Sequence, residues 1–219
     1  MGPRMRLPGT MQVMTFTYPP RRVALLVLGC VVLGVGVAML LTADLGSDGF
    51  STLVNGLSIA SGMSFLVANA VISLLFLVAA ALRRFFPGAG TLVQIVVVGW
   101  TVSFLIDLLE TPDGLPWRFA LLAAALPVVA LGIALYLGAN TGAGPAESAA
   151  LAWDPPVPFK WSYSLVQGGG ALVGWLLGAT IGLGTIAVIV ALGPAVDIVS
   201  RLLRLDVHQG TGAETPAPS

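Results

Sequence analysis

The chain has 219 residues, of which 57% are hydrophobic and only 9% are charged, and its mean hydropathy is +0.95. Soluble globular domains carry about a quarter charged residues. This composition therefore excludes an ordinary soluble domain and predicts a protein embedded in a lipid bilayer. The ten basic and ten acidic side chains balance in number, and we expect no nucleic-acid partner.

The chain has a single cysteine, Cys30, and a single histidine, His208. Cys30 lies in the first apolar stretch, where it cannot form an internal disulfide and is best interpreted as a small apolar filler. His208 lies in the polar C-terminal tail, so no histidine-based metal site or catalytic dyad is available within the membrane. We therefore expect no catalytic residues, no metal site and no cofactor, and a protein that is not an enzyme.

Residues 1–22 are polar and contain several prolines, and we expect them to form a cytoplasmic N-terminal segment. The apolar stretch that follows is too long for the core of a signal peptide, so it predicts a retained first helix. It is the first of six apolar stretches of about 18 to 21 residues, each long enough to cross a hydrocarbon core about 30 Å thick. The six predicted spans are Val23–Leu41, Phe65–Leu82, Thr91–Leu109, Trp117–Leu137, Trp161–Ile181 and Thr185–Leu203.

The basic residues are distributed unevenly over this topology. If the N-terminus is cytoplasmic, nine of the ten fall on the cytoplasmic side and only Arg118 falls outside. This asymmetry follows the positive-inside rule and predicts a bacterial plasma-membrane protein with both termini in the cytoplasm. Residues 206–219 are expected to be a disordered cytoplasmic tail. The nine cytoplasmic residues are Arg4, Arg6, Arg21, Arg22, Arg83, Arg84, Lys160, Arg201 and Arg204.

The two halves of the chain resemble each other at a constant shift of 96 residues. We infer a duplication with one membrane repeat over residues 23–110 and a second over residues 117–205. Because each repeat has three spans, the second must enter the membrane from the opposite face, which is the inverted arrangement of many secondary transporters. At this shift Asp44 meets Asn140, and an identical residue is met by each of Gly36, Ala38, Leu41, Ala43 and Gly46.

Each repeat has a polar break after its first span, followed by a short segment. In the first repeat this segment, residues 44–60, has apolar residues at helical spacing, and Ser47 or Asp48 is placed to cap its N-terminus. In the second repeat the segment covers residues 143–153.

In that second segment Pro145 suits the first helical position and Glu147 lies in the first turn, where the helix dipole favours an acid. Two interpretations of the paired segments stay open. They are either re-entrant half-helices that line a central cavity, or interfacial helices that lie flat on the membrane surface.

The break Ala43-Asp44-Leu45-Gly46, followed by Gly62-Met63-Ser64-Phe65 and later by Gly90-Thr91, resembles the YczE/YitT-like family of bacterial integral membrane proteins. The resemblance covers nearly the whole chain. It implies the topology described above, and the family has no established activity to carry over. The chain departs from the family in the first break, where Gly49-Phe50-Ser51 replaces the usual Pro-Trp-Asp.

Polar residues within the spans and the breaks are candidate sites, because a polar group deep in a membrane is costly. The competing interpretations are hydrogen bonds between helices for the amides, helix capping for the two break residues, and an ion pair with Arg201 for the acid in the last span. The candidate substrate-binding residues are Asp44, Asp48, Asn69, Gln94, Asn140, Glu147, Gln167 and Asp197.

Two functional classes fit these features. The favoured hypothesis is a transporter or permease for an unknown small solute, because inverted repeats, paired breaks and sparse intramembrane polar groups are typical of that class. The alternative is a non-transporting scaffold or accessory protein for another membrane or biosynthetic complex. In both cases the lipid bilayer is the main partner, and the question of a homo-oligomer stays open.

Overall fold

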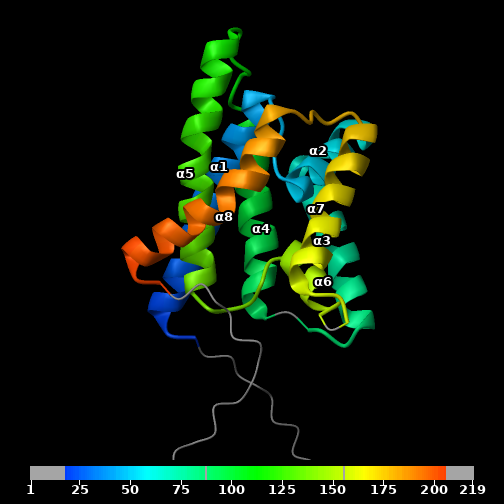
Figure 1. The fold of residues 1–219 in the computed structure, drawn as a ribbon, viewed down its shortest axis with the longest axis vertical. Helices are drawn as coiled ribbons and strands as arrows, with labels where there is room; N and C mark the ends of the chain where they lie inside the picture. Colours follow the sequence, from blue (N-terminus) through cyan, green and yellow to red (C-terminus); the bar gives the residue numbers. More distant parts are fainter. Residues whose placement is uncertain (1–17, 87, 155, 206–219) are drawn as a thin grey trace, which may run out of the picture.

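The structure of the protein is a computed structural model that describes residues 18–86, 88–154 and 156–205. Over these residues it consists of α-helices without a strand (Figure 1), which confirms the all-α fold expected from the sequence. The predicted C-terminal tail and most of the N-terminal segment lie outside the described residues. The helices are α1 (Pro20–Ala43), α2 (Gly49–Ser61), α3 (Phe65–Leu82), α4 (Ala89–Ile106), α5 (Leu115–Gly138), α6 (Pro145–Leu151), α7 (Phe159–Leu176) and α8 (Leu183–Leu203).

Five helices, α1, α3, α4, α5 and α8, are long and apolar enough to cross a membrane. The helix at the remaining predicted span, α7, is as long as α3 but is less apolar, because it carries Tyr163, Gln167 and three successive glycines. It also stops at Leu176, five residues before the predicted end at Ile181. The structure therefore supports a multi-span membrane protein, and a sixth span at α7 stays a prediction.

The local sequence explains where the two short helices begin. The N–H of Ser51 donates to Asp48 Oδ2 at 3.0 Å, so Asp48 is the residue that caps α2. Pro145 opens α6 and Glu147 lies in its first turn, as expected. A proline suits this position because the first N–H groups of a helix have no partner within the helix.

The helices form two groups that lie side by side in Figure 1. In the first group, α1 packs against α4 and α5, and α5 packs against α8. In the second group, α2 and α6 each pack against both α3 and α7. Contact between α3 and α4 joins the groups. We call α1, α4, α5 and α8 the long-helix group, and α2, α3, α6 and α7 the short-helix group.

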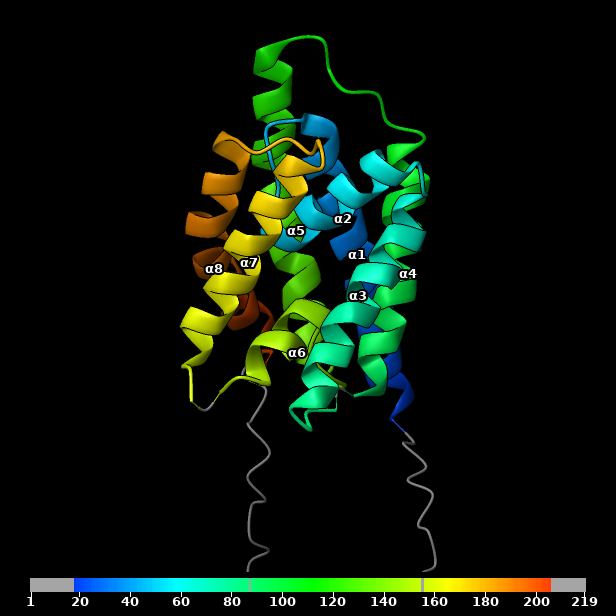
Figure 2. The same cartoon turned by 90° about the vertical axis from the view of Figure 1, so that its right-hand side faces the viewer.

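The position of α2 depends on close contact between its backbone and that of α7. Gly49 lies against the backbone of Gln167, and Gly56 lies against Gly174, so α2 begins about halfway along α7 and runs parallel to it. A Cβ at either of these α2 glycines would overlap the α7 backbone, so the approach requires glycine. In Figure 2, α2 lies in the upper half of the molecule and α6 in the lower half.

The connections after α1 and after α5 are each tied to the start of another long helix. The Gly184 N–H, at the start of α8, donates to the Leu45 carbonyl at 2.7 Å. The Gly90 N–H, at the start of α4, donates to the Thr141 carbonyl at 3.1 Å. Leu45 and Thr141 are 96 residues apart, so corresponding positions of the two halves make the same kind of contact.

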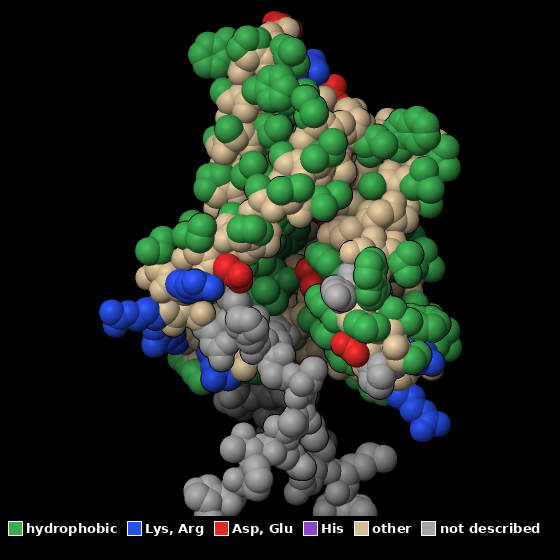
Figure 3. Space-filling model, in the orientation of Figure 1, with side chains coloured by type: hydrophobic (Ala, Val, Ile, Leu, Met, Phe, Trp, Pro, Cys, Tyr) green, Lys and Arg blue, Asp and Glu red, His purple; other side chains and the backbone are tan. Residues whose placement is uncertain are grey.

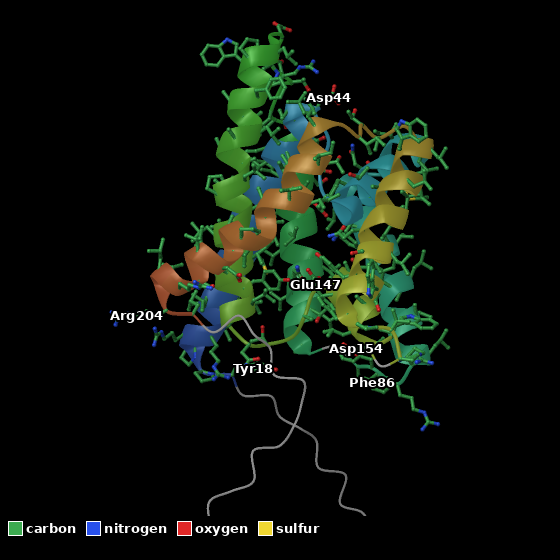
Figure 4. The ribbon with its side chains drawn as sticks, in the orientation of Figure 1. Tyr18, Asp44, Phe86, Glu147, Asp154 and Arg204 are labelled. Atoms are coloured by element: carbon green, nitrogen blue, oxygen red, sulfur yellow. The ribbon has the colours of Figure 1, made fainter. Side chains whose placement is uncertain are left out.

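Charged residues sort between the two ends of the molecule. Figure 4 places Tyr18 and Arg204 at the lower end and Asp44 at the upper end. Most of the basic side chains visible in Figure 3 also lie near the lower end. At the upper end, the Arg118 guanidinium forms an ion pair with Asp44 at 3.1 Å.

The contact between α2 and α7 can be tested with two glycines of the same helix. A Cβ at Gly174 would overlap the backbone of Thr52, whereas a Cβ at Gly168 would meet nothing within 4 Å. We expect Gly174→Ala to destabilise the protein by about 1–3 kcal/mol, the usual range for overpacking. Gly168→Ala should be neutral or stabilising by up to about 1 kcal/mol, because alanine favours a helix. Thermal unfolding in detergent measures both, and equal effects of the two substitutions would contradict the contact.

Candidate functional site

A cavity of about 90 Å³ lies where the two helix groups meet. It is lined by the first turns of α2, α3 and α6 and by residues of α1, α4, α5, α7 and α8. Figure 3 shows the molecule hollowed on one face near this level. The volume suits several water molecules or one small solute. The polar residues that line it are Asp48, Ser51, Asn69, Gln94, Tyr136, Glu147, Tyr163 and Gln167.

Five of the eight candidate residues line this one cavity, although they come from five different parts of the chain. They are Asp48, Asn69, Gln94, Glu147 and Gln167. The fold therefore brings together residues that the sequence could only nominate one at a time. Their role in substrate binding stays a prediction.

Glu147 occupies the centre of the polar surface. The Tyr136 hydroxyl lies 3.4 Å from Glu147 Oε1, at hydrogen-bonding distance, and Tyr163 also interacts with this carboxyl. Gly144 leaves the room that the acid needs, because a Cβ there would overlap Glu147 Oε2. Figure 4 shows Glu147 between α6 and the long-helix group.

Gln167 connects α2 to this centre. Its Oε1 accepts a hydrogen bond from the Phe50 N–H at 2.9 Å, and its Nε2 donates to the Tyr163 hydroxyl at 2.8 Å. The amide thus satisfies one of the free N–H groups in the first turn of α2 and orients a hydroxyl toward Glu147. Gln167 therefore makes the hydrogen bond between helices that we considered for it, and it also lines the cavity.

The other two amides differ from each other. Asn69 Nδ2 donates to the Ile95 carbonyl at 2.8 Å and so links α3 to α4. Gln94 is 9% exposed, and its Oε1 has no hydrogen-bond partner among the described residues. A buried amide oxygen without a hydrogen-bond partner costs about 1–3 kcal/mol. A ligand with a hydrogen-bond donor could satisfy the Gln94 oxygen.

The cavity is acidic. Two acids, Asp48 and Glu147, line it, whereas none of the described lining residues is Lys, Arg or His. Burial raises the pKa of Asp48 above its ordinary value of 3.8. Burial also raises the pKa of Glu147 above 4.5, and the neighbouring Asp48 carboxyl adds to this rise.

The remaining three candidates, Asp44, Asn140 and Asp197, lie away from the cavity. Asp44 and Asn140 both end a long helix, at φ of 50°, but α1 and α5 end at opposite ends of the molecule (Figure 1). Asp44 is held there by Arg118 and by a hydrogen bond from Thr180. Asn140 is exposed. Helix capping, the competing interpretation, describes both residues.

Asp197 is also exposed and does not line the cavity. The ion pair with Arg201 that we considered for it does not form in the described part of the chain. Both side chains are exposed, and an ion pair between exposed side chains contributes little to stability. No group of three or more His, Cys, Asp or Glu residues in the described ranges could hold a metal ion.

Sequence reasoning missed Tyr136, Ser51 and Tyr163. The two tyrosines were treated as ordinary residues of apolar spans, although a tyrosine hydroxyl in the middle of a span needs a partner. Ser51 occupies the position at which the YczE/YitT-like pattern has an acid, and it lines the cavity beside Asp48. The acid of this chain therefore lies three residues earlier than that pattern expects.

The raised pKa of Glu147 predicts how its neutral variant behaves. The folded protein keeps Glu147 protonated to a higher pH than the unfolded chain, so ionisation destabilises the fold as the pH rises above about 4.5. Glu147→Gln removes this effect, and we expect it to raise the unfolding temperature at about pH 8 but hardly at about pH 4. Each pKa unit of the rise corresponds to about 1.4 kcal/mol. Asp197→Asn is the control, and a lower unfolding temperature of Glu147→Gln at pH 8 would contradict the prediction.

Comparison with known proteins gives a family without naming an activity. A protein of Haemophilus influenzae, described as an uncharacterized protein, is 26% identical over 190 residues, which cover 83% of this chain and 86% of that protein. No solved structure matches the chain. The comparisons do not confirm the YczE/YitT-like name. A family model described as a family of unknown function, DUF6198, matches residues 20–201, and the chain therefore belongs to the DUF6198 family.

Proposed function

We propose that the protein is a membrane transporter that binds a small polar solute in the cavity between the two helix groups. The observation that carries this proposal is the meeting of Asp48, Glu147, Gln94 and Gln167 around one cavity. Half-buried carboxyls without a cation and an amide oxygen without a partner weaken a fold unless they serve a ligand. The YczE/YitT-like topology and the bacterial plasma membrane remain part of the proposal.

Inverted repeats are supported by the way in which the helices pair. If α1 to α4 correspond to α5 to α8, the contact of α1 with α4 corresponds to that of α5 with α8. The contact of α2 with α7 likewise corresponds to that of α6 with α3, and the contact of α2 with α3 to that of α6 with α7. Two copies related by a twofold axis would generate these pairs.

The short helices favour the re-entrant interpretation. Both begin beside the cavity. The first half of α2 is largely buried, including Thr52 and Val54, and so are most residues of α6, including Ser148 and Ala149. A helix lying flat on a membrane surface would instead expose one polar face to water. We infer that α2 and α6 enter the bilayer from opposite faces and that both chain termini are cytoplasmic, as the basic residues indicate.

We assign to Asp44 the contacts that close the upper side of the cavity. Its carboxylate contacts Arg118, at the start of α5, and Thr180, in the connection between α7 and α8. These contacts join the ends of three helices above the cavity. In the proposed mechanism the Thr180 contact, which ties the end of α7 to the long-helix group, separates when the short-helix group moves, and the cavity then opens to the outside.

The proposal can be tested before any solute is known. Cys30 is the only cysteine of the chain, so Cys30→Ser gives a background without thiols, and Ser51→Cys then places one thiol in the cavity. A transporter with alternating access exposes this thiol to each side of the membrane in turn. We expect a membrane-impermeant methanethiosulfonate to modify Ser51→Cys both in right-side-out and in inside-out vesicles.

Two exposed positions serve as sidedness controls. Asp113, between α4 and α5, lies at the upper end, and Arg84, after α3, at the lower end. Cysteines at these positions should each react from one side only, and from opposite sides. A Ser51→Cys thiol that reacts from one side only, or from neither, would contradict transport and favour the scaffold alternative.

A further inference from the structure

We infer that the solute bound in this cavity is a small organic ammonium ion. This inference rests on the proposed function and names the class of its substrate. An alkylammonium group is a compact cation with three N–H donors. The cavity offers acceptors and negative charge from three different elements, the start of α2, the middle of α4 and the first turn of α6.

Charge is the first reason. Asp48 and Glu147 line the same cavity, and Asp48 lies close enough to affect the ionisation of Glu147. No described residue that lines the cavity carries a positive charge. An anionic solute would have to enter beside two carboxyls without a cation to neutralise it. A monovalent cation instead permits both carboxyls to share one proton or to ionise at a small cost.

Hydrogen-bonding capacity is the second reason, and it is independent of charge. Gln94 is more than nine-tenths buried, and its Oε1 has no partner among the described residues. This oxygen lies next to Glu147, because a Cβ on Gly144 would overlap Glu147 Oε2 and would stand 2.8 Å from Gln94 Oε1. The pair forms a ready acceptor site for two N–H groups of one ligand.

The apolar lining distinguishes an organic cation from a metal ion. Phe50, Phe65, Tyr136 and Tyr163 line the cavity beside the acids. Aromatic rings attract ammonium groups through their electron-rich faces and also accommodate a short alkyl chain. Divalent metal sites in proteins are usually built around several charged or imidazole ligands, and no group of three or more His, Cys, Asp or Glu residues that could hold a metal ion is present in the described ranges. The size of the cavity restricts the ligand to a few heavy atoms.

The charge preference can be measured at the Ser51→Cys thiol in the Cys30→Ser background. We expect a cationic methanethiosulfonate to react about tenfold faster than an anionic one, after each rate is divided by that at the Asp113→Cys surface control. Adding Glu147→Gln should remove most of this ratio, because a charge-assisted contact is worth about tenfold or more. Adding Asp197→Asn should leave it unchanged. Ile133→Cys, also in the cavity lining, is a second reporter if Ser51→Cys does not fold.

Protection identifies the ligand class directly. Methylammonium should slow modification of the cavity thiol, and the protection should be lost in Gln94→Leu and Glu147→Gln. Acetamide and acetate are the neutral and anionic probes, and sodium chloride tests a simple metal cation. Protection by acetamide, acetate or sodium that equals or exceeds that by methylammonium would overturn the inference, as would an equal rate of the two reagents.

The two proposals fail in different ways. Reaction of the cavity thiol from both sides without a cation preference leaves transport intact and removes the ammonium ion as the substrate class. A cation preference with access from one side only removes transport and leaves an ammonium-binding site. Loss of both features removes the two proposals together.

Discussion

The backbone contact between α2 and α7 holds the polar start of α2 inside the molecule, and the cavity depends on it. A helix that starts at this depth leaves N–H groups that water cannot satisfy. Two side chains supply the partners, because Asp48 accepts from Ser51 and Gln167 accepts from Phe50. The glycines bring α7 close enough for Gln167 to reach. The same side chains that satisfy the helix start thereby become the wall of the cavity.

The second short helix solves the same problem with different residues. Pro145, its first residue, has no N–H group, and the Ser148 N–H is satisfied by the Gly144 carbonyl. Gln167 and Asp48 therefore have no counterpart that caps α6, and Glu147 is left free to interact with Tyr136 and Tyr163. The two short helices therefore present different side chains to the cavity.

Much of the fold could be predicted because hydrophobicity, turn residues and caps are local properties. α3 coincides with its predicted span, and Asp48, Pro145 and Glu147 lie where the caps and first turns were expected. The end of α7 was missed because continuous apolar sequence hides a turn at Gly178, which has a φ of 103°. Nothing local in the sequence distinguishes that glycine from those within the helix.

The site was harder to predict, because which polar residues meet is decided by packing between distant elements. Asp44 and Asn140 were nominated because they are equivalent at the 96-residue shift, but α1 and α5 end at opposite ends of the molecule. The residues that meet at the centre are those a few positions further on. Tyr136 and Tyr163 carried a usable signal, a hydroxyl inside an apolar helix, which composition alone does not reveal.

The acids at the end of the molecule and those in the cavity differ in whether a cation lies beside them. Asp44 lies at one end of the molecule, where Arg118 balances its charge at 3.1 Å. Asp48 is only four residues away in sequence, but it lies against the cavity with Glu147 and with no cation among the described residues of the lining. A fold can pair, expose or neutralise a charge, so two neighbouring acids without a cation are the feature on which the proposed binding site rests. In the proposed site, an ammonium ligand supplies the positive charge that the lining lacks.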